Sequence, residues 1–385
     1  MTRILHFIPD DKFVDMIIDE LNGFSDVSNR YCMYNRKSAD EIRWHKHIDC
    51  VEFTPYGSEK LNEILKECRE GLYDGVWFHS LPDHVDYFVA NCGTIKKVFI
   101  SWGQDIYGMM RYREYLPETK RFMRSFLFQG TTKGVAWRIF RDVQKWMSTS
   151  VLGYPLIRYV KTVANNMDYI APVLSEDVEL FRRAYPRLRV PETKEFQYGY
   201  YNIEPSVGTD RPIGPILVNN SATPSGNHVD VFRKLDVIGV KSVLIVPLNY
   251  GNPSTYLDFV KNKGEEILGN RFVPILDFMP KDEYFKYISQ CTHMVMGHLR
   301  QQALANIAYG LSSGMKVFFW KDNPVYRQFT RWGFSLFALE DAKKEDFKRV
   351  LPVDEQRKNA ELLMQHFGRD AMIGKLKRII ASMGR

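Results

Sequence analysis

Short apolar runs without alternation constrain the fold of this chain more than any other feature of its sequence. Residues 75–78 (GVWF) and 97–102 (KVFISW) are such runs, and amphipathic segments with helical spacing separate them from their neighbours. Strands that are apolar on both faces are typical of parallel sheets covered by helices on both sides. The first half of the chain therefore predicts a doubly wound α/β domain. Its other expected strands are residues 3–8, 31–34, 51–53 and 168–172.

A stretch with five prolines, residues 185–215, divides this half from a second series of strands and helices. The second series predicts strands at residues 215–219, 242–247, 271–274, 292–296 and 316–320, with helices at 227–236, 253–267, 281–289 and 301–312. We expect an acceptor- and membrane-facing domain over 1–200, a nucleotide-sugar domain over 214–350 and a helical tail over 351–385. Two such halves are typical of the GT-B architecture of nucleotide-sugar glycosyltransferases, in which two Rossmann-like domains face each other across a cleft.

Composition excludes several other classes of protein. The 385 residues are 45% apolar, and the five cysteines are scattered without a CxxC pair, so a zinc site or disulfide framework is not expected and a reducing cytoplasm fits. No apolar run approaches the ~18 residues of a membrane span, and the first residues read as a strand rather than a signal peptide. The chain has no GxGxxG and no Asp-x-Asp. We therefore expect no dinucleotide cofactor and no bound metal.

Residues 111–161 form a basic and aromatic insert. They hold eleven Lys and Arg against three acids, a net charge of +8 that exceeds the +7 of the whole chain. Within it, the spacing of the aromatic and basic side chains predicts an amphipathic helix with a basic rim. The expected membrane or acceptor residues are Trp137, Arg138, Arg141, Lys145 and Trp146. The alternatives are a solvated helical face over an ordinary core, or a nucleic-acid surface.

Polar residues follow several strands of the second half. Arg300, Gln301 and Gln302 open a predicted helix, where free backbone N–H groups and the helix dipole suit an anion. The diphosphate of a nucleotide-sugar is the anion we expect, and Asn306 shares a helix face with Gln302. The other expected donor-binding residues are Asn219, Asn220, Ser221, Asn249, Tyr250, Phe278 and Met279. The alternatives are a capped turn at 219–227, a surface turn at Tyr250 and a hydrophobic staple at Phe278.

Two strand ends in the first half carry candidates for catalysis. Residues 75–78 lead into His79, and residues 97–102 lead into Gly103-Gln104-Asp105. Transfer to a sugar hydroxyl needs a general base within hydrogen-bond reach, and either side chain suits that role, with Asp105 preferred. The alternatives are a helix cap for Asp105 and a core histidine bonded to a backbone carbonyl for His79.

Several motifs in order resemble those of glycosyltransferase family 56, the bacterial TDP-N-acetylfucosamine:lipid II N-acetylfucosaminyltransferases. They are FHSL from Phe78, WGQDIY from Trp102, VNNSATPSGNHVD from Val218, VPLNYGNPSTYLDFV from Val246 and ISQC…RQQ…DNPVY from Ile288 to Tyr326. The resemblance implies a GT-B fold and a dTDP-linked 4-amino- or acetamido-4,6-dideoxyhexose donor. It also implies an acceptor saccharide on undecaprenyl pyrophosphate and a peripheral place on the cytoplasmic membrane face, in the synthesis of a cell-surface polysaccharide like enterobacterial common antigen.

This sequence departs from the family pattern in two places. Ala303-Leu304-Ala305-Asn306 follows Arg-Gln-Gln where glycine-rich residues are expected, and the basic insert is larger than expected. The expected partners are the donor, the lipid-linked acceptor and an anionic membrane surface, without nucleic acid. The competing functions are a GT-B transferase with another donor, a nucleic-acid-binding protein that uses 111–161, and a nucleotide-sugar binder without catalysis.

Overall fold

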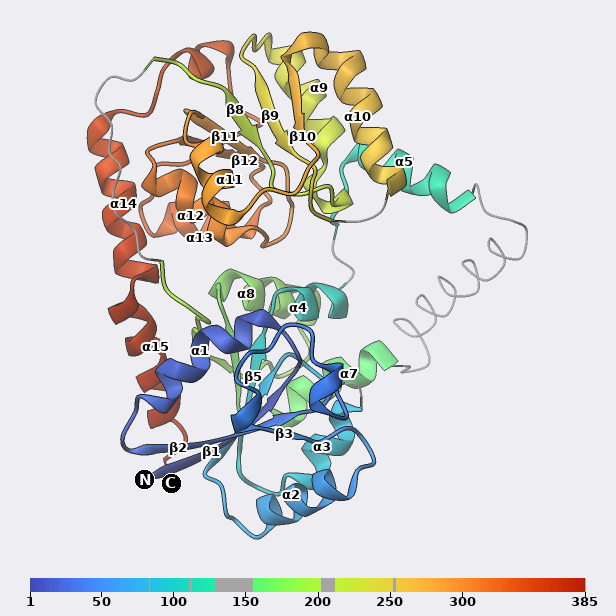
Figure 1. The fold of residues 1–385 in the computed structure, drawn as a ribbon, viewed down its shortest axis with the longest axis vertical. Helices are drawn as coiled ribbons and strands as arrows, with labels where there is room; N and C mark the ends of the chain where they lie inside the picture. The colour runs from blue at the N-terminus through green and yellow to red at the C-terminus, as the bar shows by residue number, and fades with distance from the viewer. Residues whose placement is uncertain (83, 111–112, 129–154, 202–211, 252–253, 385) are drawn as a thin grey trace. The chain divides into compact units, whose positions relative to one another are not determined.

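The computed structural model describes residues 1–82, 84–110, 113–128, 155–201, 212–251 and 254–384. The chain divides into two compact units, each assembled from separate stretches of sequence. Unit 1 contains Met1–Tyr112, Phe140–Tyr200 and Phe367–Arg385, and unit 2 contains Arg113–Ile139 and Tyr201–His366. Figure 1 follows the chain through both units.

Unit 1 is built on a seven-stranded sheet in the order β3-β2-β1-β4-β5-β6-β7, and its neighbouring strands pair in parallel. The strands are β1 (Thr2–Ile8), β2 (Val27–Met33), β3 (Val51–Phe53), β4 (Gly75–His79), β5 (Lys96–Ser101), β6 (Tyr169–Pro172) and β7 (Glu192–Thr193). The strands predicted in this half therefore exist, with ends that differ by a few residues. Local apolar patterning is enough to find them because both faces of the sheet are buried.

Helices cover the sheet of unit 1 on both faces (Figure 1). They are α1 (Lys12–Asn22), α2 (Glu59–Arg69), α3 (Val85–Asn91), α4 (Gln104–Met109), α7 (Pro155–Asn166), α8 (Ser175–Ala184) and α15 (Arg369–Ala381). Successive residues of β1 pack into different clusters: Leu5 and Phe7 join one core, whereas Ile4 and Ile8 join another. Because side chains alternate along a strand, this division shows that each face of the sheet has its own core.

Unit 2 repeats the architecture on a six-stranded parallel sheet in the order β10-β9-β8-β11-β12-β13. The strands are β8 (Ile216–Val218), β9 (Leu244–Pro247), β10 (Phe272–Ile275), β11 (His293–Met296), β12 (Lys316–Phe319) and β13 (Phe337–Ala338). The helices are α5 (Pro117–Phe128), α9 (His228–Ile238), α10 (Ser254–Leu268), α11 (Lys281–Ile288), α12 (Leu304–Ser312), α13 (Pro324–Arg331) and α14 (Val353–Phe367). Two parallel sheets with crossover helices agree with the predicted pair of Rossmann-like domains.

The structure draws one domain boundary differently from the sequence interpretation, which placed 110–165 in the first domain. Helix α5 packs on unit 2, where the Asp230 carboxylate accepts the N–H groups of Glu118 (2.8 Å) and Thr119 (3.0 Å). Phe122 stacks on Phe259 with ring centroids 4.3 Å apart. A carboxylate from α9 therefore caps α5, and an aromatic contact holds the helix in place.

The predicted helical tail is also shared between the units. Helix α15 packs Met372, Leu376 and Ile379 into the core of unit 1. Arg369 at its start pairs with Glu20 of α1 at 2.8 Å, and Figure 1 draws these two helices side by side. The tail is helical as predicted, but its final helix belongs to unit 1 because its apolar face completes that core.

Strand order reverses at one place in each sheet, and these places locate the candidate sites. The reversal lies between β1 and β4 in unit 1 and between β8 and β11 in unit 2. Ligands of open parallel sheets bind beyond the carboxyl ends of the strands at such a reversal. The loops after β8 and β11 in unit 2, and those after β1 and β4 in unit 1, are therefore the first places to look for function. The loop after β5 adjoins the loop after β4.

Candidate functional site

The loops after β8 and β11 are tied together by Asn219. This residue is fully buried with a positive φ of 59°, which directs the chain sharply out of β8. Its amide nitrogen donates to the Gly226 carbonyl (2.8 Å), and its amide oxygen accepts the N–H of Gly297 (2.7 Å). Asn219 was predicted to contact the donor, but both ends of its amide are engaged within the protein. Its side chain joins the loop after β8 to the loop after β11.

A cluster of hydroxyl and amide groups closes the same two loops. The Ser225 hydroxyl donates to Gln302 Oε1 at 2.8 Å, and Gln302 Nε2 donates to the Thr223 hydroxyl at 3.2 Å. The Ser221 hydroxyl lies 3.2 Å from that of Thr223. The fold thus brings the predicted residues Ser221 and Gln302 together through Thr223 and Ser225.

Three side chains at this edge carry buried polar atoms that have no hydrogen-bond partner among the described residues. They are both ring nitrogens of His298, Nε of Arg300 and Oδ1 of Asn220. His298 is only 1% exposed. Leaving such groups unpaired costs about 1–3 kcal/mol each, and native proteins contain few of them. Their gathering beside the reversal of strand order indicates a ligand site.

The electrostatics of His298 restrict what it offers to a ligand. Burial, with smaller contributions from the neighbouring His228 and Arg300, lowers its pKa to about 3. The ring is therefore neutral at physiological pH and offers one N–H donor and one acceptor nitrogen. Arg300 supplies the permanent positive charge of the site. Together they suit an anion that accepts one hydrogen bond from a neutral donor and one from a cation.

The helix that was predicted to begin at Arg300–Gln302 begins later. Helix α12 starts at Leu304, after Ala303 with a left-handed φ of 60°. The expectation that Gln302 and Asn306 share one helix face is therefore wrong, because a left-handed residue separates them. Asn306 Nδ2 instead donates to the Tyr284 hydroxyl (3.2 Å), which ties α12 to α11. Gln301 lies half-buried in the loop beside Arg300.

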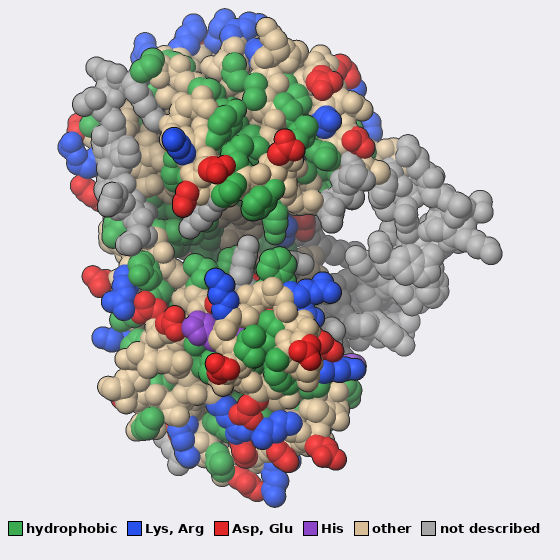
Figure 2. Space-filling model, viewed as in Figure 1, with side chains coloured by type: hydrophobic (Ala, Val, Ile, Leu, Met, Phe, Trp, Pro, Cys, Tyr) green, Lys and Arg blue, Asp and Glu red, His purple; other side chains and the backbone are tan. Residues whose placement is uncertain are grey.

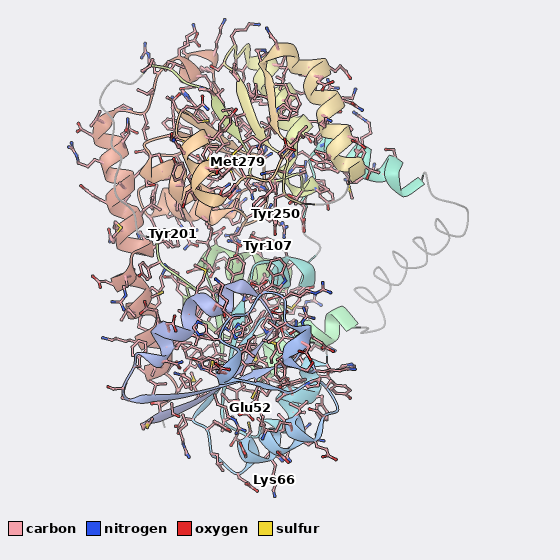
Figure 3. The ribbon with its side chains drawn as sticks, viewed as in Figure 1. Glu52, Lys66, Tyr107, Tyr201, Tyr250 and Met279 are labelled. Carbon is pink, nitrogen blue, oxygen red and sulfur yellow. The ribbon has the colours of Figure 1, made fainter. Side chains whose placement is uncertain are left out.

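The loops after β9 and β10 present exposed apolar side chains at the same edge of the sheet. Asn249 Nδ2 donates to the Asp277 carbonyl (3.0 Å) and joins the two loops. The Tyr250 and Phe278 side chains are 69% and 84% exposed. Figure 3 labels Tyr250 and Met279, which come from the loops after β9 and β10. Figure 2 shows hydrophobic side chains on the visible face of unit 2.

Met279 also borders an open depression of about 460 Å³. The other side chains that line it are Glu283, Lys286, Tyr287 and Gln290 of α11 and the turn after it. The Tyr250 backbone is joined to the first loop of the site, since its carbonyl accepts the Ala222 N–H at 2.7 Å. The loop of Tyr250 is therefore hydrogen-bonded to the polar loop after β8. Its exposed ring offers a stacking surface to a planar, partly apolar group.

In unit 1, a chain of hydrogen bonds holds His79 in the core. His79 lies between Tyr198 and His6, at 3.0 Å from each, and the far nitrogen of His6 lies 2.9 Å from Asn29 Oδ1. Asn29 Oδ1 only accepts, so His6 donates to it from Nε2 and accepts at Nδ1. His79 must then donate to His6 from Nε2 and accept the Tyr198 hydroxyl proton at Nδ1. The Trp102 indole N–H donates to the Tyr198 oxygen.

This arrangement leaves His79 unsuited to act as a general base. Burial lowers the pKa of His79 well below its usual value and that of His6 to about 4. The only basic nitrogen of His79 is occupied by Tyr198. The histidine is a core residue, as the alternative reading held, but its partners are side chains rather than a backbone carbonyl.

Asp105 lies at the neighbouring strand end and keeps its capacity to accept a proton. Its Oδ1 accepts the Ser80 hydroxyl (2.9 Å), and its Oδ2 accepts the Trp102 N–H (3.2 Å). The side chain is half-buried, and burial raises its pKa. A carboxylate with a raised pKa and unused lone pairs is a better proton acceptor than an ordinary aspartate. It also braces the turn before α4, so the capping alternative holds in part.

Sequence reasoning missed His298 and could have found it. The residue lies two positions after an apolar strand, and such strand ends carry ligand groups in parallel sheets. The predicted residues Trp137, Arg138, Arg141, Lys145 and Trp146 lie outside the described residues. Within the described ranges, no group of three or more His, Cys, Asp or Glu side chains is placed to hold a metal ion.

Comparisons with known proteins agree with this architecture. A family model described as "4-alpha-L-fucosyltransferase glycosyl transferase group 56" matches residues 199–361, which contain the loops after β8, β9, β10 and β11. The FHSL and WGQDIY motifs lie before the matched residues. No curated protein gives a match to the sequence.

Solved glycosyltransferases have the same fold over nearly the whole chain. A glycosyltransferase from Rickettsia africae ESF-5 aligns with a TM-score of 0.59 at 10% identity, covering 99% of this chain and 98% of that one. A UDP-forming α,α-trehalose-phosphate synthase from Burkholderia xenovorans aligns at 0.60 and 11%, covering 100% and 99%. Sucrose-phosphate synthase from Thermosynechococcus elongatus aligns at 0.59 and 12%, covering 100% of each chain. The chain therefore has the GT-B fold of these glycosyltransferases, and its residues 199–361 match the model of glycosyl transferase group 56.

Proposed function

We propose that the enzyme moves a 4-amino- or 4-acetamido-4,6-dideoxyhexose from a dTDP-sugar to a saccharide on undecaprenyl pyrophosphate. The observation that carries this proposal is the group 56 match over the very loops that hold the unpaired atoms of His298, Arg300 and Asn220. A nucleotide-sugar donor brings the diphosphate that such a site would bind. The product would be a cell-surface polysaccharide of the enterobacterial common antigen kind.

In this proposal the site in unit 2 stabilises the leaving nucleotide. Negative charge develops on the diphosphate as the bond to the sugar breaks. Arg300 would balance that charge, and the neutral His298 ring would donate a hydrogen bond from its buried N–H. Both groups are already desolvated and held by loops that Asn219 and Gln302 join, so little reorganisation is needed during the reaction.

Asp105 is the base that we assign to the acceptor hydroxyl. Its raised pKa suits it to take the proton, and Ser80 and Trp102 fix the orientation of its carboxylate. His79 has no such role here, because its accepting nitrogen is bonded to Tyr198. The base of the nucleotide would lie against the exposed Tyr250 and Phe278 rings, with Met279 beside them.

A lipid-linked acceptor requires that the enzyme reach a membrane surface. None of the helices among the described residues combines the length and apolar character needed to cross a bilayer. We propose peripheral attachment to the cytoplasmic face through the basic insert. Its described part, α5, carries Lys120, Arg121 and Arg124 exposed to solvent. Each basic side chain near an anionic leaflet contributes about 1 kcal/mol.

A nucleotide panel tests the donor assignment. Calorimetric titration of the full chain with dTDP, dTMP, UDP and GDP should give tightest binding for the thymidine nucleotides, because the exposed loops favour a pyrimidine with an apolar methyl group. Equal or tighter binding of GDP would remove the donor assignment.

Co-sedimentation with anionic vesicles tests the membrane assignment. Trp137→Glu combined with Trp146→Glu should abolish pelleting and activity on a lipid acceptor, while turnover on a short-chain soluble acceptor survives. Unchanged pelleting of the folded double variant, or its global unfolding, would mean that these aromatics belong to a core.

A further inference from the structure

The guanidinium of Arg300 faces a carboxylate inside its own unit. Glu114 Oε2 lies 3.7 Å from Arg300 Nε, within ion-pair distance but too far for a hydrogen bond. The two side chains are 27% and 22% exposed, so the pair is only partly screened by water. Arg300 Nε is buried and has no hydrogen-bond partner among the described residues. The positive charge of Arg300 is thus balanced by Glu114, while its Nε–H group has no hydrogen-bond acceptor among the described residues.

The backbone around Glu114 is fixed to the two loops that form the site. Asn227 Nδ2 donates to the Glu114 carbonyl (3.0 Å), and Asn227 Oδ1 accepts the Leu116 N–H (2.8 Å). The same amide nitrogen lies within hydrogen-bond distance of the carbonyls of Gly297 (2.9 Å) and Ser225 (3.1 Å), so its two N–H groups are shared among three acceptors. Asn227 is fully buried. One side chain therefore holds the segment of Glu114 against the loops after β8 and β11.

The pKa of the neighbouring Tyr115 is affected by the charges of both Glu114 and Arg300. Burial raises the pKa of its hydroxyl, the charge of Glu114 adds to that effect, and the charge of Arg300 opposes it. The three side chains therefore share one partly desolvated environment, in which charges act on each other more strongly than in water.

We propose that Glu114 is a specificity-determining residue that stands in for the donor anion. Its carboxylate balances the charge of Arg300, and an anionic ligand binds Arg300 by displacing that carboxylate. A diphosphate carries more negative charge than one carboxylate and accepts hydrogen bonds that Glu114 does not reach. A singly charged or neutral ligand has no such advantage, so Glu114 selects for the diphosphate part of the donor. The inference rests on the proposed donor site at Arg300.

Anion affinity of a matched pair of variants tests the proposal. Glu114→Gln removes the competing charge and keeps the shape, whereas Glu118→Gln removes a charge from the same segment that pairs with Arg121 and Arg233 instead. Calorimetry on the full chain would use inorganic pyrophosphate and dTDP as separate probes. Glu114→Gln should tighten binding of both probes by roughly 3- to 10-fold, the scale of one partly screened ion pair. Glu118→Gln should leave both affinities unchanged.

A double-mutant cycle of Glu114 and Arg300 separates this effect from a general change in net charge. In an Arg300→Ala background, Glu114→Gln should no longer tighten pyrophosphate binding, because the charge it releases is gone. Glu114→Asp keeps the charge but shortens its reach, and it should give a smaller gain than Glu114→Gln. This variant reads the same interaction if Glu114→Gln does not fold.

The outcomes distinguish this inference from the donor assignment. If folded Glu114→Gln binds pyrophosphate no more tightly than the unaltered enzyme, Glu114 is structural and the inference fails, even where dTDP binds. If pyrophosphate binds and responds to Glu114→Gln while dTDP does not bind, the inference stands and the donor class is wrong. Equal tightening by Glu118→Gln would also overturn the inference, since the effect would then be one of overall charge.

Discussion

Histidines that follow the strands of the two sheets differ in one respect that separates structure from function. His79, at the end of β4, is fully buried, and each of its ring nitrogens has a side-chain partner, Tyr198 and His6. His298, just beyond β11, is buried to the same degree, yet neither of its nitrogens has a partner among the described residues. Burial and a depressed pKa are common to both. The two histidines differ in hydrogen bonding: both ring nitrogens of His79 have partners, whereas those of His298 are available to a ligand.

Asp105→Asn should have the largest effect on turnover. The substitution keeps the hydrogen-bonding shape next to Ser80 and Trp102 but removes basicity. Loss of a general base costs about 10²- to 10⁴-fold in kcat. Steady-state kinetics with an acceptor saccharide would measure it, with a thermal unfolding scan as the control for folding. Full activity in Asp105→Asn, together with loss of activity in a folded His79→Ala, would reverse the roles assigned to the two strand ends.

Arg300→Ala should be nearly as damaging, but in the other unit. Removing one charge-assisted contact to the developing diphosphate should cost ~2–4 kcal/mol of transition-state stabilisation, the scale of one oxyanion donor. The ratio of kcat/KM values between the unaltered enzyme and the variant measures this cost directly. Turnover close to normal would mean that Arg300 serves only to pair with Glu114.

The same substitution at both histidines tests the comparison itself. His79→Phe leaves the Tyr198 hydroxyl and His6 Nδ1 unpaired, so the free energy of unfolding should fall by about 2–4 kcal/mol, while dTDP affinity stays constant. His298→Phe removes two unpaired buried nitrogens, so stability should hold or rise. Its dTDP affinity should fall by roughly 10-fold or more, the scale of a hydrogen bond to a charged group. Urea unfolding and calorimetry would measure the two quantities, and an equal loss of stability in both variants would remove the distinction.

Lowering the pH should reduce the free energy of unfolding, because His79 and His298 both have lowered pKa values in the folded state. We expect this effect to be smaller than those of the substitutions. The folded pKa is about 3 for His298, about 4 for His6 and well below the usual value for His79, so these rings stay neutral in the native state as pH falls. The unfolded chain takes up those protons below about pH 6.5. Each ring therefore lowers the free energy of unfolding by about 1.4 kcal/mol per pH unit as pH falls from there.

Asp177 works in the opposite direction. Burial raises its pKa to about 7, so it contributes stability below its unfolded pKa that is lost as pH rises towards 7. The histidines outnumber it, and the net result should be lower stability near pH 5 than near pH 7. Urea unfolding at the two pH values should show a shallower pH dependence for both His79→Phe and His298→Phe. A pH dependence that neither substitution changes would contradict the assigned protonation states.

The strands were predictable from sequence because their signal is local. The apolar run 75–78 lies within β4 (Gly75–His79), and the run 292–296 contains β11 (His293–Met296). The reversal of strand order, by contrast, required the pairing of β8 with β11. These strands are adjacent in the sheet, although their carboxyl ends, Val218 and Met296, are 78 residues apart in the sequence. The candidate site could be predicted at the level of loops, since polar residues follow those strands, but the role of each side chain could not.

Individual residues show which sequence predictions agree with the structure and which do not. Arg300 was chosen because a helix was expected to begin there. The structure starts that helix at Leu304, yet it places the guanidinium among unpaired buried atoms. The shared face expected for Gln302 and Asn306 failed, because the left-handed Ala303 interrupts the helix. Asn219 was chosen for its amide, yet the amide nitrogen donates to Gly226 and the amide oxygen accepts from Gly297.

The sequence by itself determined a parallel α/β fold in two halves and the polar residues that follow the strands of each half. These follow from hydrophobic periodicity and from residue types at strand ends, which are properties of neighbouring residues. Only the tertiary structure decided that α5 joins unit 2 and that the ring nitrogens of His79 have hydrogen-bond partners. It also decided that those of His298 have none among the described residues. Each of these depends on partners distant in sequence, such as Asp230 for α5 and Tyr198 for His79. Hydrogen bonds between distant residues form only when the chain has folded, and no local pattern encodes which polar atom will remain without one.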